Sequence, residues 1–131
     1  MPWLILGVAA LLLAGWAITR MGSVSPEQAR AMLQSGAVVI DVRTAHEFAS
    51  GALPGVVNIP LDDLRHRIAS VVPHRATPVL LHCKSGGRSG LGSKLLRSMG
   101  YGNVGNLGSL ARAASILSPA SANRDDPTPT A

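Results

Sequence analysis

Short aliphatic runs, each too brief for a helix, constrain the fold of this chain more than any other feature. They lie at residues 37–41, 56–60, 78–82 and 103–107. Such runs, rich in β-branched residues, predict buried strands. Aromatic residues make up only 3% of the 131 residues and hydrophobic residues 47%, so the core must be built from aliphatic side chains.

Helix signals separate these runs. Ser25 as N-cap, with Gln28 completing a capping box, predicts a helix that ends near Gly36. Apolar spacing predicts further helices over residues 61–71 and 89–99. Strands that alternate with helices indicate a small α/β domain whose parallel sheet is covered by helices on both faces.

The N-terminal segment carries no charge from residue 3 to residue 19 and has Trp3 and Trp16 near its two ends. A helix of this length is at the short end of what crosses a bilayer, and interfacial aromatics are typical of such helices. We therefore expect residues 1–21 to form one transmembrane anchor. A cleaved signal peptide and a buried core helix are the alternatives.

The charges around this segment predict its orientation. Arg20 and Arg30 follow it and no Lys or Arg precedes it, which favours an inner (cytoplasmic) membrane location with the domain facing the cytoplasm. An exported domain is the alternative. We expect the folded domain over residues 22–117, and a disordered tail over residues 118–131, which has few side chains to bury.

Charge and composition exclude several other classes of protein. The net charge is +5, but the Lys and Arg residues are scattered rather than interleaved with aromatics, so we expect no nucleic-acid binding. A single cysteine excludes an internal disulfide. His46, His66 and His74 are scattered as well, and we expect no metal site.

One loop carries the chemistry. Cys83 directly follows a predicted strand, and small residues lead from it to a predicted helix. Such a loop can turn its backbone N–H groups toward one point, where they bind an anion together with the helix N-terminus. The charges of Lys84 and Arg88 favour the same outcome, which is a reactive thiolate at Cys83. The residues of this candidate loop are Lys84, Ser85, Gly86, Gly87, Arg88 and Ser89.

The sequence Cys-Lys-Ser-Gly-Gly-Arg-Ser resembles the active-site loop of single-domain bacterial rhodaneses. Other matching pieces follow in the order of that family, and together they cover most of residues 23–107. These pieces are Asp41-Val42-Arg43, His46-Glu47-Phe48 with Gly51, Pro54-Gly55-Val56-Val57-Asn58-Ile59-Pro60, and Gly100-Tyr101-Gly102-Asn103-Val104.

The resemblance implies a rhodanese-like domain and a sulfurtransferase without a cofactor. Cys83 would take sulfane sulfur from thiosulfate or another donor, become a persulfide, and pass the sulfur to cyanide or a thiol. The amides from Lys84 to Ser89 would surround the sulfur, and Lys84 and Arg88 would attract an anionic donor. Asp41 and Arg43 would be structural supports. A protein that donates or accepts sulfur is a further class of partner.

Loop length separates this reading from cysteine-dependent phosphatases and arsenate reductases. Phosphatases place five residues between Cys and Arg, whereas four lie between Cys83 and Arg88. The shorter ring suits a single sulfur atom better than a phosphate. A membrane-bound sulfur-carrier or docking module, without turnover of free thiosulfate, is the alternative function.

Two places depart from the family pattern. Ala52 stands where many members have His, and residues 108–112 replace a Gly-Gly pair followed by Trp. These departures leave open the wall of the pocket and the length of the last helix.

Overall fold

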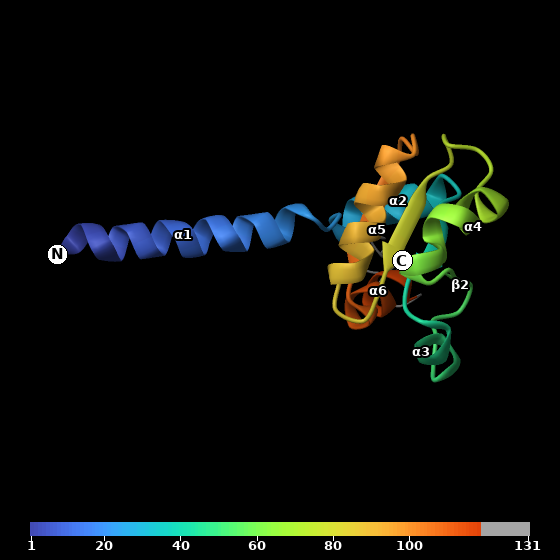
Figure 1. The fold of residues 1–131 in the computed structure, drawn as a ribbon, viewed down its shortest axis with the longest axis horizontal. Coiled ribbons are helices and arrows are strands. Elements are labelled where there is room, and N and C mark those ends of the chain that lie inside the picture. The colour runs from blue at the N-terminus through green and yellow to red at the C-terminus, as the bar shows by residue number, and fades with distance from the viewer. Residues whose placement is uncertain (119–131) are drawn as a thin grey trace, which may run out of the picture.

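The computed structural model describes the backbone of residues 1–118, and their side chains except for those of residues 15–21. In this part of the chain, four parallel strands form one sheet in the order β2-β1-β3-β4 (Figure 1). The predicted α/β fold with a parallel sheet is confirmed. The strands are β1 (Val38–Asp41), β2 (Val57–Asn58), β3 (Val79–His82) and β4 (Val104–Gly108).

Helices cover both faces of the sheet because successive strand side chains point in opposite directions. Ile40 and Leu81 belong to the core on one face, with side chains of α4 and α5. Val39 and Leu80 belong to the core on the other face, with side chains of α2 and α6. The four helices are α2 (Pro26–Gln34), α4 (Leu64–Val71), α5 (Gly87–Ser98) and α6 (Leu110–Leu117).

The capping signals of α2 act as predicted. The Ser25 hydroxyl accepts from the Gln28 N–H at 3.1 Å, and the Gln28 side chain accepts from the Ser25 N–H at 3.2 Å. Gly36, with φ of +87°, follows the end of the helix. The helix predicted over residues 61–71 divides into a 3₁₀ turn, η1 (Leu61–Asp63), and α4.

Two helical segments near the loop differ from expectation. Helix α5 begins at Gly87, two residues before the predicted start at residue 89, so Arg88 lies in its first turn. The five-residue helix α3 (Ala45–Ala49) was not predicted, because so short a segment shows no apolar period. Its N-cap is Thr44, which forms a capping box with Glu47.

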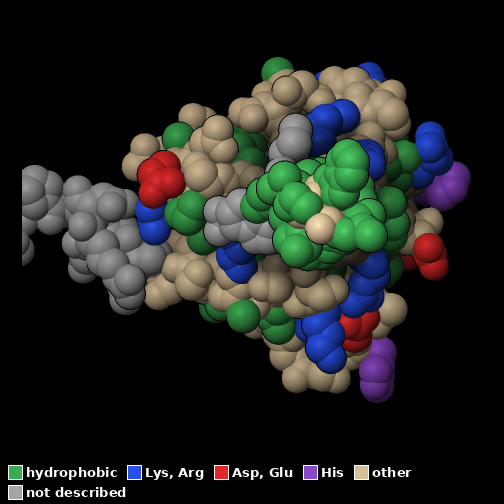
Figure 2. All heavy atoms as spheres, turned by 90° about the vertical axis from the view of Figure 1, so that its left-hand side faces the viewer, with side chains coloured by type: hydrophobic (Ala, Val, Ile, Leu, Met, Phe, Trp, Pro, Cys, Tyr) green, Lys and Arg blue, Asp and Glu red, His purple; other side chains and the backbone are tan. Residues whose placement is uncertain are grey.

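The N-terminal helix α1 (Pro2–Met21) extends away from the domain (Figure 1). Its described side chains, those up to residue 14, are exposed, and Figure 2 shows their apolar surface end-on. Among the described residues, no helix is both long and apolar enough to span a bilayer. The predicted transmembrane anchor is therefore not confirmed.

The side chain of Arg20, used for the orientation, and residues 119–131 of the predicted tail lie outside the described part of the chain. The boundaries at residues 22 and 117 stay predictions.

Packing around Gly105 in β4 generates a test of this fold. A Cβ at Gly105 would lie 2.7 Å from Val24 Cγ1 and 2.9 Å from Leu80 Cδ2, which is too close for normal contact. We predict that Gly105→Ala lowers the free energy of unfolding by about 1–3 kcal/mol through overpacking. Urea denaturation of the full chain measures this change.

Gly102→Ala is the matched control, because a Cβ at Gly102 has no neighbour within 4 Å. Equal stability of the two variants would contradict the close packing of Gly105 in β4 against Val24, which precedes α2.

Candidate active site

The end of β3 places the cysteine. Cys83 follows His82, the last residue of β3, and its side chain is buried. Its N–H donates to the carbonyl of Gly108 at the end of β4, at 3.2 Å. A bridge between Ser85 and Ser109 ties the loop to the segment after β4. The active-site loop (residues 83–89) thus lies at the carboxyl ends of two neighbouring strands, where sites of open parallel sheets form.

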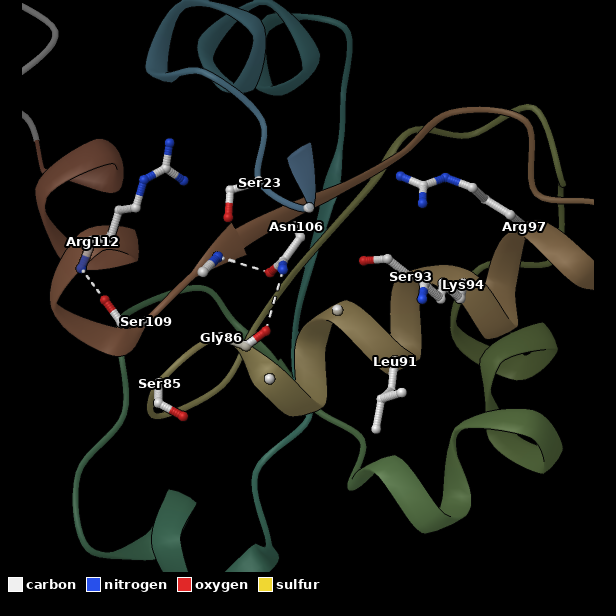
Figure 3. Close-up of a pocket in the computed structure, with 14 residues that line it drawn as sticks. Ser23, Ser85, Gly86, Leu91, Ser93, Lys94, Arg97, Asn106, Ser109 and Arg112 are labelled. Atoms are coloured by element: carbon white, nitrogen blue, oxygen red, sulfur yellow. Dashed lines mark hydrogen bonds between the residues drawn. The ribbon is translucent and has the colours of Figure 1, made fainter. Parts of the chain in front are cut away.

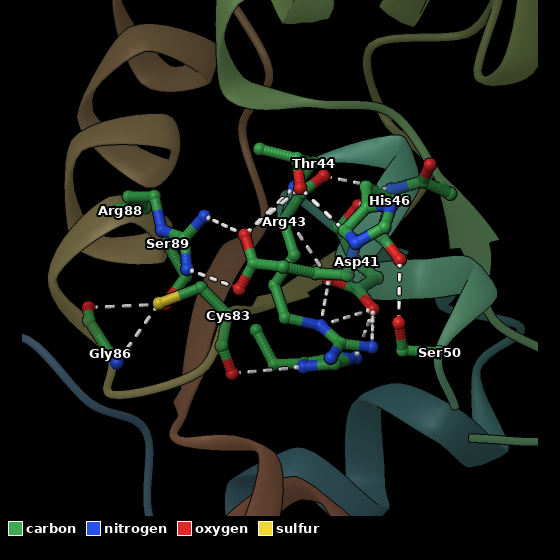
Figure 4. Close-up of polar contacts among 12 residues, drawn as sticks. Asp41, Arg43, Thr44, His46, Ser50, Cys83, Gly86, Arg88 and Ser89 are labelled. Atoms are coloured by element: carbon green, nitrogen blue, oxygen red, sulfur yellow. Dashed lines mark hydrogen bonds and ion pairs between the residues drawn. The ribbon is translucent and has the colours of Figure 1, made fainter. Parts of the chain in front are cut away.

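Hydrogen-bond donors surround the sulfur of Cys83 (Figure 4). The N–H of Gly86 donates to Sγ at 2.9 Å, and the Ser89 hydroxyl lies within 3.5 Å of it. Burial raises the pKa of the Cys83 thiol, but the hydrogen bonds from the Ser89 hydroxyl and from the backbone of Ser89, Gly86 and Ser85 outweigh it. The pKa is lowered as a result, so the loop stabilises the thiolate, the nucleophilic form.

The backbone at Gly86 allows this geometry. Its φ of +103° is a left-handed conformation, and an added Cβ would lie 3.3 Å from Cα of Gly108. Asn106 of β4 fixes the same segment, because its Nδ2 donates to the Gly86 carbonyl at 3.3 Å and its Oδ1 accepts from the Gly108 N–H at 2.8 Å (Figure 3). Sequence analysis missed Asn106, because the strand pattern gives its side chain no role.

An open pocket of about 770 Å³ borders the outer side of this segment (Figure 3). Its lining includes Ser85, Gly86, Gly87, Asn106, Gly108 and Arg112, but not Cys83. The pocket therefore touches the backbone of the loop without opening onto the sulfur.

Arg88 is not an unpaired cation. Its guanidinium makes two bonds to the carboxylate of Glu47 in α3, at 2.6 Å and 3.0 Å. Hydrogen bonds from Arg88 and Thr44 lower the pKa of Glu47 to about 2, and Glu47 raises the pKa of Arg88. Cys83 also raises the pKa of Arg88, so the cation lies within the electrostatic field of the sulfur. Sequence analysis missed Glu47, although it lies in a matching family segment.

Lys84 and Gly87 complete the predicted loop. The Lys84 side chain is exposed, and its backbone carbonyl accepts from the Leu110 N–H at 3.2 Å. Gly87 is the first residue of α5, which directs its N-terminal end at the loop. Of the predicted loop residues, Ser85, Gly86 and Ser89 provide the hydrogen bonds that lower the pKa of Cys83, whereas the charges of Lys84 and Arg88 are not among its main causes.

Asp41 and Arg43 form a buried pair at the end of β1. The Arg43 Nε donates to both carboxylate oxygens of Asp41, at 3.1 Å and 2.9 Å, and an Nη donates to the carbonyl of Gly51 at 2.8 Å. Buried His82 places Nε2 3.8 Å from Asp41 and Nδ1 3.3 Å from the carbonyl oxygen of Cys83. These contacts connect the segment after β1 with the residue before Cys83.

Comparison with known proteins identifies a family and several relatives with the same kind of domain. Residues 25–111 match the family described as "Rhodanese-like domain". The thiosulfate sulfurtransferase PspE of Escherichia coli is 38% identical over 71 residues, which cover 54% of this chain and 68% of the relative. The thiosulfate sulfurtransferase GlpE of Stutzerimonas stutzeri is 32% identical over 91 residues, which cover 69% of this chain and 81% of the relative.

Solved structures share the fold. A rhodanese from E. coli, solved with anions, has a TM-score of 0.57 and 35% identity, over 59% of this chain and 91% of that one. The human single-domain sulfurtransferase TSTD1 has a TM-score of 0.55 and 24% identity, over 80% of this chain and 97% of that one, which shows likeness of fold alone.

A parallel α/β domain with an activated cysteine in the loop after β3 is the arrangement of a thiolate enzyme. The chain belongs to the rhodanese-like domain family.

The Ser89 hydroxyl provides a test of the loop. We predict that Ser89→Ala raises the pKa of the Cys83 thiol, because a hydrogen bond to the thiolate is lost. The pH dependence of the alkylation rate of Cys83 measures this pKa.

Ser93→Ala is the control, because the Ser93 hydroxyl lies one turn further along α5 and donates to the Ser89 carbonyl at 2.8 Å. The same shift in both variants, or no shift in Ser89→Ala, would contradict a direct role of the Ser89 hydroxyl.

Proposed function

We propose that this chain moves sulfane sulfur from thiosulfate or another donor to cyanide or a thiol, through a persulfide on Cys83. The observation that supports this most is the set of donors around Sγ, which lowers the pKa of the buried thiol. The same donors suit a persulfide, since its terminal sulfur is also a small anion. Cys83 is the proposed catalytic residue.

The reaction has two half-steps. The Cys83 thiolate attacks the outer sulfur of thiosulfate, the S–S bond of the donor breaks, and sulfite leaves with the bonding electron pair. The new Sγ–S bond makes Cys83 a persulfide anion. Cyanide or a thiolate then attacks the terminal sulfur, the Sγ–S bond breaks, and thiocyanate or an organic persulfide leaves as the thiolate returns. Such a covalent intermediate divides one difficult transfer into two simpler ones.

The names of the relatives support the choice of donor. PspE and GlpE are thiosulfate sulfurtransferases, and the E. coli rhodanese was solved with anions. The backbone of Ser85, Gly86 and Ser89, rather than a metal or cofactor, would hold the sulfur in this chain.

Intact mass spectrometry tests the proposal. The reduced full chain is incubated with thiosulfate, and cyanide is added afterwards. We predict a gain of one sulfur atom (~32 Da), lost on adding cyanide with release of thiocyanate, as expected of an activated thiolate. Cys83→Ser should gain no sulfur and keep its fold, because the loop geometry is set by the backbone.

Sulfur transfer by the Cys83→Ser variant would contradict the proposed mechanism. No adduct on the folded wild-type chain would favour the other candidate, a sulfur-carrier or docking module that takes sulfur only from a protein. The departures at Ala52 and residues 108–112 motivate that candidate.

We also propose that α1 attaches the domain to the inner membrane, with the domain facing the cytoplasm. The exposed large apolar side chains of its described part, from Trp3 to Leu13, support this, because such surfaces in water are binding surfaces. An exported domain remains the alternative orientation.

Membrane fractionation of cells that produce the full chain tests this attachment. We predict that the chain sediments with the membranes, whereas a chain that begins at Gly22 stays in the supernatant. Resistance of the full chain to alkaline carbonate would indicate insertion rather than surface binding. Recovery of the full-length chain in the supernatant would refute the attachment. A reporter protein fused after Ala131 would show on which side of the membrane the domain lies.

A further inference from the structure

A second, smaller pocket is lined in part by Ala52 and Leu110. It has a volume of about 390 Å³ and is open to solvent. Ala52 and Leu110, from the two departing segments, line it together with Leu53, Glu47 and Arg43. The Leu110 N–H donates to the carbonyl of Lys84, so this pocket adjoins the active-site loop.

The charged groups that line this pocket are already neutralised. Arg43 pairs with Asp41, and Glu47 pairs with Arg88 through two bonds. Ala52, Leu53 and Leu110 contribute apolar surface. A molecule that approaches the active-site loop from this side would therefore meet little net positive charge from Arg43 and Arg88.

Glu47 is held in place by two residues. Its Oε1 accepts from the N–H and the hydroxyl of Thr44, at 3.2 Å and 3.1 Å, as part of the capping box of α3. Arg88 donates to the same Oε1 at 2.6 Å and to Oε2 at 3.0 Å. With its pKa lowered to about 2, Glu47 is ionised throughout the physiological range, so the Arg88 charge is compensated at every relevant pH.

We propose that Glu47 determines the charge preference of this enzyme. By neutralising Arg88, it makes Cys83 react preferentially with thiols and persulfides that carry at most one negative charge, and less readily with dianions such as thiosulfate. This inference rests on the proposed sulfur transfer for its substrates, but the charge effect itself acts on any reagent that reaches Cys83.

Glu47→Gln removes the charge and little else. Gln is also accepted at the third position of a capping box, so α3 keeps its cap, and the amide oxygen can still accept from Arg88. The variant leaves the Arg88 cation uncompensated within the field of the sulfur. Adding or removing one unit charge at a solvent-exposed site changes the association constant of a charged ligand roughly fivefold for each unit of charge on the ligand.

The first measurement is the ratio of Cys83 alkylation rates by anionic iodoacetate and neutral iodoacetamide, with the full chain. We predict that Glu47→Gln raises this ratio about threefold or more at low salt, that the gain shrinks at high salt, and that Arg88→Ala lowers the ratio. Steady-state kinetics should show a higher kcat/KM of Glu47→Gln for thiosulfate, mainly through a lower KM.

Glu27→Gln is the matched control, since it makes the same chemical change in the first turn of α2 and should leave the ratio unchanged. An unchanged or lower ratio in Glu47→Gln would overturn the proposal, as would an equal rise in Glu27→Gln. The alkylation ratio does not depend on sulfur transfer. If no persulfide forms but the ratio still rises, the proposed function fails while the charge effect of Glu47 is supported.

Discussion

The N–H of Gly86 points at the sulfur of Cys83, 2.9 Å away, because the backbone there takes a φ of +103° and lies against Gly108. A side chain at either glycine would interfere with this approach or with the backbone conformation. Asn106 then fixes the Gly86 carbonyl from the side of β4. The reactivity of the only cysteine therefore depends on how closely the loop after β3 packs on the end of β4.

The thiolate is stabilised by oriented dipoles more than by full charges. Arg43 and Arg88 are each bound to a carboxylate. Hydrogen bonds from the loop act on a buried sulfur, where they are stronger than in water and little affected by salt. A persulfide carries one negative charge on its small terminal sulfur. The N–H groups of the loop can stabilise this charge without a net positive charge that would also attract other anions.

Local patterns in the sequence were sufficient for most of the fold. The four aliphatic runs became the four strands, and the capping box of Ser25 and Gln28 became the start of α2. The helix α3 escaped prediction because it spans little more than one turn. Helix α5 begins two residues early because Gly86 completes the turn of the loop, a conformation that the order of residues alone does not fix.

The sequence by itself indicated where the reactive group lies: Cys83 follows a buried strand and precedes Lys84, Ser85, two glycines and a helix, an order typical of an anion-binding loop. Tertiary structure decided what surrounds it. Glu47 reaches Arg88 across 41 residues of chain, and Asn106 reaches Gly86 across 20. The order of the strands in the sheet brings these segments together, and no local spacing records that order. For this reason the nucleophile could be recognised from its neighbours in sequence, whereas the charge that its partners meet depends on its neighbours in space.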